Sequence, residues 1–137
     1  MRLFVDSSAF IALADDTDRD HRAANGCSET WPVEIQLHAS NYIVAETITR
    51  LRRTVGHRAA LQWAKAARGN PQITWHYADD ETDREALRVF ERYHDHPLSF
   101  VDCTTVVWLQ RLHLDRIFTF DHDFQRLGYT LVPGLTS

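Results

Sequence analysis

Short apolar runs alternate with helix-length segments along most of the chain, and this order is the strongest constraint on its fold. Five segments have the length and composition of strands: residues 2–5, 34–39, 73–77, 116–120 and 130–132. Strands separated by helices usually pair in parallel, because the connecting helix returns the chain to the same edge of the sheet. The sequence therefore predicts an α/β protein with a central parallel sheet.

The segments between the predicted strands carry helix signals. Ser7 or Ser8 can cap a helix that runs to Ala14. The other helices are expected as a short one ending near residue 29 and over residues 41–55, 57–68, about 79–94 and 99–113, with a helical turn over 122–127. No linker, repeat or low-complexity segment divides the chain, so residues 1–137 are expected to form a single domain.

Composition argues against several classes of protein. No apolar stretch approaches the roughly 20 residues that span a bilayer, and the acid at position 6 comes too early for a secretory signal peptide. Two cysteines make neither a disulfide framework nor a zinc site. We therefore expect a cytoplasmic protein. The formal net charge of −4 does not indicate a nucleic-acid binder, although six of the basic residues lie between positions 46 and 70.

Four acidic residues stand where an apolar run ends or within a predicted helix: Asp6, Glu46, Asp102 and Asp121. Asp6 and Asp121 follow predicted strands, and open parallel sheets bind ligands beyond the carboxyl ends of their strands. Carboxylates are rarely buried unless they are paired or bind a cation, and several carboxylates brought together repel one another. A divalent ion that prefers oxygen ligands, such as Mg²⁺ or Mn²⁺, would remove this conflict.

Each of these acids also has a local interpretation. Asp6 can cap the first helix and Asp121 can cap the turn that follows its strand. Asp102 completes a Ser-x-x-Asp pattern typical of a capping box. Glu46 lies four residues before Arg50, the favourable order for an ion pair on a helix surface. The local roles explain the acids singly but not why all four follow the same pattern.

Four segments then stand out as an ordered set: Asp6–Phe10, Asn41–Thr47, Leu98–Asp102 and Thr119–Phe124. Together they resemble the four motifs of PIN-domain ribonucleases, and most closely those of the VapC toxins of bacterial toxin–antitoxin pairs. Each motif alone is weak, whereas the ordered set, which covers nearly the whole chain, is specific. The resemblance implies a three-layer α/β/α fold around a central parallel sheet. It also implies an Mg²⁺- or Mn²⁺-dependent endoribonuclease that acts as the toxin of a type II system.

Position by position, the resemblance assigns metal binding and catalysis to four acids, of which the first two match the principal metal ligands: Asp6, Asp102, Glu46 and Asp121. Ser8 and Thr119 match hydroxyl positions that orient ligands or solvent, and Asp123 is an additional acid that can assist or replace Asp121. The family's usual partners are implied as well: an RNA substrate, a second copy of the chain in a homodimer, and a cognate antitoxin whose tail enters the acidic groove.

For the reaction, we predict that an activated water attacks the RNA phosphorus and leaves a 5′-phosphate and a 3′-hydroxyl. Glu46 or Asp121 would position or deprotonate this water. Arg50 and Arg53 lie four and seven residues after Glu46, which places all three on one helix face. These two arginines are therefore candidates for binding the RNA backbone.

Two other functions stay open. One is a non-catalytic α/β interaction module whose acids cap helices and bind a partner's arginines. The other is a phosphatase in which Asp6 accepts the phosphoryl group, although that chemistry usually has a second acid two residues later, where this chain has Ser8.

Three further features are given structural roles. Trp63 and Trp75 are expected in the core or at a dimer interface rather than stacked on bases. The acids of segment 15–20 are expected in solvent, and His122 is expected in a turn.

Overall fold

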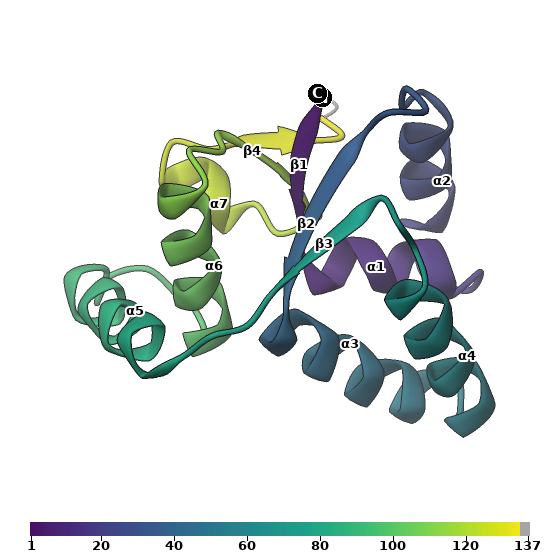
Figure 1. The fold of residues 1–137 in the computed structure, drawn as a ribbon, viewed down its shortest axis with the longest axis horizontal. Helices are drawn as coiled ribbons and strands as arrows, with labels where there is room; N and C mark the ends of the chain where they lie inside the picture. The colour runs from purple at the N-terminus through teal and green to yellow at the C-terminus, as the bar shows by residue number, and fades with distance from the viewer. Residues whose placement is uncertain (135–137) are drawn as a thin grey trace.

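The computed structural model describes residues 1–134, and within them five strands form one parallel sheet (Figure 1). The strands are β1 (Arg2–Val5), β2 (Gln36–Ser40), β3 (Ile73–His76), β4 (Arg116–Phe118) and β5 (Thr130–Val132). They lie in the order β3-β2-β1-β4-β5, and every neighbouring pair is parallel. The predicted parallel sheet is therefore confirmed.

Helices cover both faces of this sheet. They are α1 (Ser7–Ala14), α2 (His21–Glu29), α3 (Asn41–Thr54), α4 (His57–Arg68), α5 (Asp80–Arg92), α6 (Phe100–Arg111) and α7 (Asp123–Arg126). In Figure 1, α1 to α4 lie on one side of the strands and α5 to α7 on the other, which confirms the expected three-layer α/β/α arrangement. The second strand begins two residues later than predicted, because the Ile35 N–H donates to the Pro32 carbonyl and closes a turn.

The two central strands form the middle of the core. Leu3, Phe4 and Val5 of β1 and Ile117 and Phe118 of β4 are fully buried. Such unbroken apolar runs are typical of parallel strands that are covered on both faces. Trp63 and Trp75 were expected to pack in the core or at a dimer interface rather than to stack on bases. In the structure the rings of both tryptophans pack on the ring of Phe10.

The direction in which strands are added reverses at β1. From β1 the chain builds β2 and β3 on one side, and then returns to place β4 and β5 on the other. Ligands of open α/β sheets bind in the crevice that such a reversal leaves at the carboxyl ends of the strands. Here that crevice lies between β1 and β4, and the Asp6 N–H extends the pairing of the two strands by donating to the Phe118 carbonyl at 3.0 Å. None of the helices in residues 1–134 has the length and apolar character needed to cross a membrane.

Candidate active site

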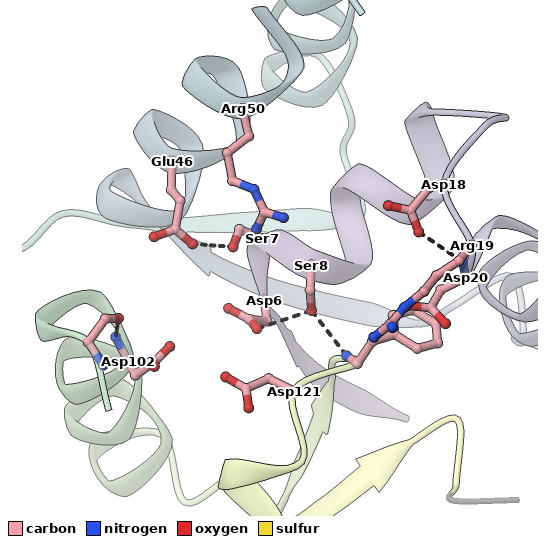
Figure 2. Close-up of a pocket in the computed structure, with 12 residues that line it drawn as sticks. Asp6, Ser7, Ser8, Asp18, Arg19, Asp20, Glu46, Arg50, Asp102 and Asp121 are labelled. Carbon is pink, nitrogen blue, oxygen red and sulfur yellow. Dashed lines mark hydrogen bonds and ion pairs between the residues drawn. The ribbon is translucent and has the colours of Figure 1, made fainter. Parts of the chain in front are cut away.

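A polar pocket of about 500 Å³ opens where β1 and β4 end (Figure 2). Its lining comes from the start of α1, the loop before α2, α3, α6 and the segment after β4. Twelve residues line it: Asp6, Ser7, Ser8, Asp18, Arg19, Asp20, Glu46, Arg50, Ser99, Asp102, Phe120 and Asp121. The four acids singled out in the sequence therefore all line one pocket, although 115 positions separate the first from the last.

Asp6 is the most buried acid of this pocket, with 4% of its surface exposed. Its side chain makes no capping hydrogen bond to α1, so the local interpretation of this residue is wrong. Instead, its Oδ2 accepts hydrogen bonds from the Thr119 hydroxyl at 2.8 Å and the Ser8 hydroxyl at 3.2 Å. Burial raises the pKa of Asp6 to about 7; the bond from Thr119 opposes this shift, and the nearby charge of Asp102 adds to it.

Ser8 and Thr119 tie the start of α1 to the end of β4. Their hydroxyl oxygens lie 3.2 Å apart. The Ser8 hydroxyl accepts the backbone N–H of Phe120 at 3.0 Å, and the Thr119 hydroxyl accepts that of Asp121 at 3.0 Å. Both side chains were expected to orient groups in the site, and the structure has them holding Asp6 and the backbone after β4. Neither Ser7 nor Ser8 caps α1 as predicted, because the helix begins one residue earlier, after Asp6.

Glu46 reaches the pocket from α3. Its Oε1 accepts a hydrogen bond from the hydroxyl of Ser7. Within residues 1–134 it forms no ion pair with Arg50, so the predicted surface pair on this helix is absent from the structure. Arg50 lines the same pocket with its guanidinium group unpaired by this acid (Figure 2).

Asp102 and Asp121 combine a local role with a place in the pocket. Asp102 forms the predicted capping box: its Oδ2 accepts the Ser99 N–H, and the Ser99 hydroxyl accepts the Asp102 N–H, each at 3.0 Å. The Oδ1 of Asp121 accepts the N–H of Asp123 at 2.9 Å at the start of α7. Each local bond occupies one carboxylate oxygen, and Figure 2 shows both carboxylates facing the same space as Asp6.

The pKa values of these two carboxyl groups are also raised. Burial lifts the pKa of Asp102 to about 6, with contributions from the charges of Asp121 and Glu46. Burial likewise raises the pKa of Asp121, and the charge of Asp123 adds to this. Both shifts arise mainly because burial removes water from the ionised carboxylate, and the neighbouring negative charges add a smaller contribution.

Two predicted residues lie outside the pocket lining. Arg53 is exposed further along α3, and Asp123 points to Arg126, with 3.6 Å between carboxylate and guanidinium. Conversely, Asp18, Arg19 and Asp20 line the pocket, a role that the sequence does not predict for this segment. Their participation depends on how the loop before α2 folds back over the strand ends, and no pattern within the loop encodes that path.

The pocket lining holds six carboxylates and two arginines, an excess of negative charge that calls for cations. Within residues 1–134, no three His, Cys, Asp or Glu side chains are already grouped closely enough to hold a metal ion. The donor chemistry nevertheless fits a hard divalent ion, because all the candidate ligands are carboxylate oxygens and burial makes their mutual repulsion costly. The side chains of Asp6, Glu46, Asp102 and Asp121 would have to draw closer around such an ion.

The sequence matches the model of a known family. The family model of the PIN domain matches residues 3–128. The chain belongs to the PIN domain family. This result confirms the resemblance inferred from the four motifs, and the matched region includes Asp6, Glu46, Asp102 and Asp121.

This PIN domain has relatives among characterised proteins of Mycobacterium tuberculosis. It is 29% identical over 130 residues to the 23S rRNA-specific endonuclease VapC20, covering 95% of this chain and 97% of that protein. It is 27% identical over 121 residues to the ribonuclease VapC26, covering 87% and 86% of the two chains. The expected likeness to VapC proteins therefore extends over most of the sequence.

Solved structures agree with this relationship. The crystal structure of M. tuberculosis VapC20, a toxin that cleaves the sarcin–ricin loop, matches with a TM-score of 0.86 and 28% identity, covering 93% of this chain and 96% of that one. A toxin–antitoxin complex from Klebsiella pneumoniae matches with a TM-score of 0.62 and 15% identity, covering 98% and 96%. The second match concerns the fold alone.

Proposed function

We propose that this PIN domain is an Mg²⁺- or Mn²⁺-dependent endoribonuclease that acts as the toxin of a type II toxin–antitoxin system. The observation that carries the proposal is the convergence of four distant acids on one pocket, with Asp6 almost completely buried there. The VapC relatives, one named as an rRNA endonuclease and one as a ribonuclease, support the choice of RNA as substrate.

In this proposal Asp6 and Asp102 are the principal ligands of the metal, and Glu46 and Asp121 complete its surroundings. When bound, a divalent ion would offset the negative charge, polarise a phosphate oxygen and lower the pKa of a water. Ser8 and Thr119 keep the Asp6 carboxylate in place through their hydrogen bonds.

The chain's own residues can also manage the attacking water. Glu46 has one oxygen held by Ser7, and Asp121 has one held by the N–H of Asp123. Each therefore keeps a second oxygen to accept a proton from a water between them and the substrate. Attack by this water in line with the leaving 3′ oxygen would give a 5′-phosphate and a 3′-hydroxyl.

The two alternatives have less support. A phosphatase of the aspartyl-phosphate type would attack through Asp6, but the Oδ2 of Asp6 is engaged by two hydroxyl groups, and position 8 supplies a serine rather than an acid. A module whose acids only cap helices does not explain Asp6 or Glu46, since neither side chain caps a helix.

The test is cleavage of a synthetic RNA hairpin carrying the sarcin–ricin loop, together with total RNA, in Mg²⁺ and in chelator. We expect the wild type to cleave RNA, and we expect chelator or the substitution Asp6→Asn to abolish this cleavage. Asp115→Asn, at an exposed acid just before the amino end of β4, should stay active. Mg²⁺ should also raise the thermal stability of the wild type but not of Asp6→Asn. Products ending in a 2′,3′-cyclic phosphate would refute the water attack, and chelator-resistant cleavage would refute the metal.

We further propose that the protein forms a homodimer, is bound by a cognate antitoxin and acts in the cytoplasm. The resemblance to VapC toxins supports the homodimer and the antitoxin, and the proposed RNA substrate supports the cytoplasmic location. Growth arrest on expression, relieved by the product of a neighbouring reading frame, would identify the antitoxin, and light scattering of the purified protein would test the dimer.

A further inference from the structure

A second hollow lies beside the acidic pocket and differs from it in chemistry. Its volume is about 230 Å³, several times the roughly 30 Å³ that a water molecule occupies. Rings and apolar groups dominate the described lining, which includes Phe120, His122, Leu131 and Pro133 with Ala23 and Asp20. Phe120 and Asp20 line both hollows, so the two spaces adjoin each other at these residues.

The backbone that carries these rings is fixed by hydrogen bonds. The Phe120 N–H donates to the Ser8 hydroxyl at 3.0 Å, which ties this residue directly to the group that holds Asp6. The Thr119 N–H donates to the Val132 carbonyl at 3.1 Å and so keeps the segment before Pro133 beside the end of β4. The His122 carbonyl accepts the Gln125 N–H at 3.1 Å. The hollow is therefore built on the same strand ends as the acidic pocket.

This lining suits a flat aromatic ligand better than a phosphate. Phenyl and imidazole rings stack on nucleobases, and they tolerate any base because every base has a π-face. The described lining holds one carboxylate and no arginine or lysine, a combination that disfavours a phosphate group. An RNA strand whose phosphate lies at the four acids carries a base on each side of that phosphate, within reach of an adjoining hollow.

We propose that this base pocket, formed by Phe120, His122, Leu131 and Pro133, receives the nucleobase next to the phosphodiester bond that is cut. The proposal rests on the proposed function for the position of that bond. It assigns a positioning role to Phe120 and His122, which hold the substrate while the acids act on the phosphate. The occupant is a base of single-stranded or looped RNA, because a base inside a duplex does not expose its face.

Binding tests this proposal without any need for cleavage. The probes are the sarcin–ricin hairpin and a short single-stranded RNA, each with the fluorescent base 2-aminopurine at one unpaired position at a time. For at least one position we expect the wild type to quench the fluorescence, since stacking on an aromatic ring quenches it. Phe120→Leu, which keeps apolar volume but removes the ring, should lose the quenching, and Phe120→Tyr should restore it. Absence of quenching at every position in both RNAs would overturn the base pocket.

Cleavage kinetics provide the second arm. An RNA that lacks the base at the contacted position should lower kcat/KM of the wild type about tenfold or more, which is about 1.4 kcal/mol. The same RNA should lower kcat/KM of Phe120→Leu much less, because the ring and the base form one interaction and their effects are not additive. If the loss in kcat/KM on removing the base were the same in the wild type and in Phe120→Leu, the proposed contact between the ring and the base would be refuted.

His122→Ala is the second variant, chosen because this exposed side chain lines the base pocket but not the acidic pocket. We expect it to raise KM severalfold with little change in kcat, whereas the matched control His94→Ala, exposed after α5, should change neither. An unchanged KM in His122→Ala would remove this residue from the pocket. Quenching without chelator-sensitive cleavage would support the base pocket and refute the metal-dependent nuclease. Chelator-sensitive cleavage without quenching would support the nuclease and refute the base pocket.

Discussion

Replacing Asp6 by asparagine should stabilise the metal-free protein while removing its response to Mg²⁺. The pKa of Asp6 is raised from 3.8 to about 7, and its side chain is almost completely buried. A carboxyl group with a raised pKa in the folded state stabilises the fold below the pKa of the unfolded chain. That stability is lost as pH rises from 3.8 through about 7, and above this range the loss is complete.

The size of the effect follows from the shift. About three pKa units at about 1.36 kcal/mol each give a cost of about 4 kcal/mol for the ionised carboxylate at pH 8. An asparagine at this position carries no charge, and its amide oxygen can still accept the hydroxyl of Thr119. Because the amide replaces the hydrogen bonds imperfectly, we expect Asp6→Asn to gain about 2–4 kcal/mol at pH 8 and almost nothing at pH 4.

Urea unfolding in chelator at pH 4 and pH 8 measures this difference. Asp115→Asn, at an exposed acid just before β4, is the matched control and should stay within about 0.5 kcal/mol of the wild type at both values. Mg²⁺ at pH 8 should then stabilise the wild type and narrow its gap to Asp6→Asn. A variant that is no more stable than the wild type at pH 8, or equally stabilised at pH 4, would refute the argument that buried charge accumulates in this pocket.

Three further predictions concern other parts of the molecule. Burial and the neighbouring His76 lower the pKa of His38 to about 4, so stability should fall by about 2–3 kcal/mol as pH drops from 6.5 to 4, and pH-dependent urea unfolding should show a smaller fall in His38→Phe. Ser99→Ala removes the capping box of α6 and should cost about 1 kcal/mol by thermal unfolding, with lower cleavage activity because Asp102 loses its anchor. Arg50→Ala should weaken RNA binding and reduce the slope of log affinity against log salt by about one in salt titrations, whereas Arg53→Ala, outside the pocket lining, should have the smaller effect.

The sequence predicts the parts of this fold that depend on local composition. Unbroken apolar runs identify β1 and β4, whose apolar residues are buried. Asp6, directly after β1, and Asp121, three residues after β4, mark the carboxyl ends of these strands as the functional end of the sheet. The capping box at Ser99 could also be predicted, because it involves only two residues three positions apart, Ser99 and Asp102. The start of β2 could not be predicted to the residue, because it depends on a turn closed by the hydrogen bond from the Ile35 N–H to the Pro32 carbonyl.

The contacts within the site depend on tertiary structure and could not be predicted. Glu46 follows the rule for an ion pair with Arg50, yet in the fold the hydroxyl of Ser7, contributed by another helix, is its partner. Asp18 and Arg19 line the pocket because of the path of the loop before α2. No helical or strand periodicity in the sequence predicts that path. A period in the sequence shows which face of an element is buried, but not which distant element it meets.

The hydroxyl links between α1 and the end of β4 carry a consequence for synthesis of the protein. Ser8 is synthesised more than a hundred residues before its partners Thr119 and Phe120. Until then the growing chain lacks the hydrogen bond from Thr119 that holds Asp6, and it lacks Asp121. If this protein cleaves RNA, a growing chain cannot do so at the ribosome that is making it before the segment from Thr119 to Asp121 has been added and has folded back onto Ser8.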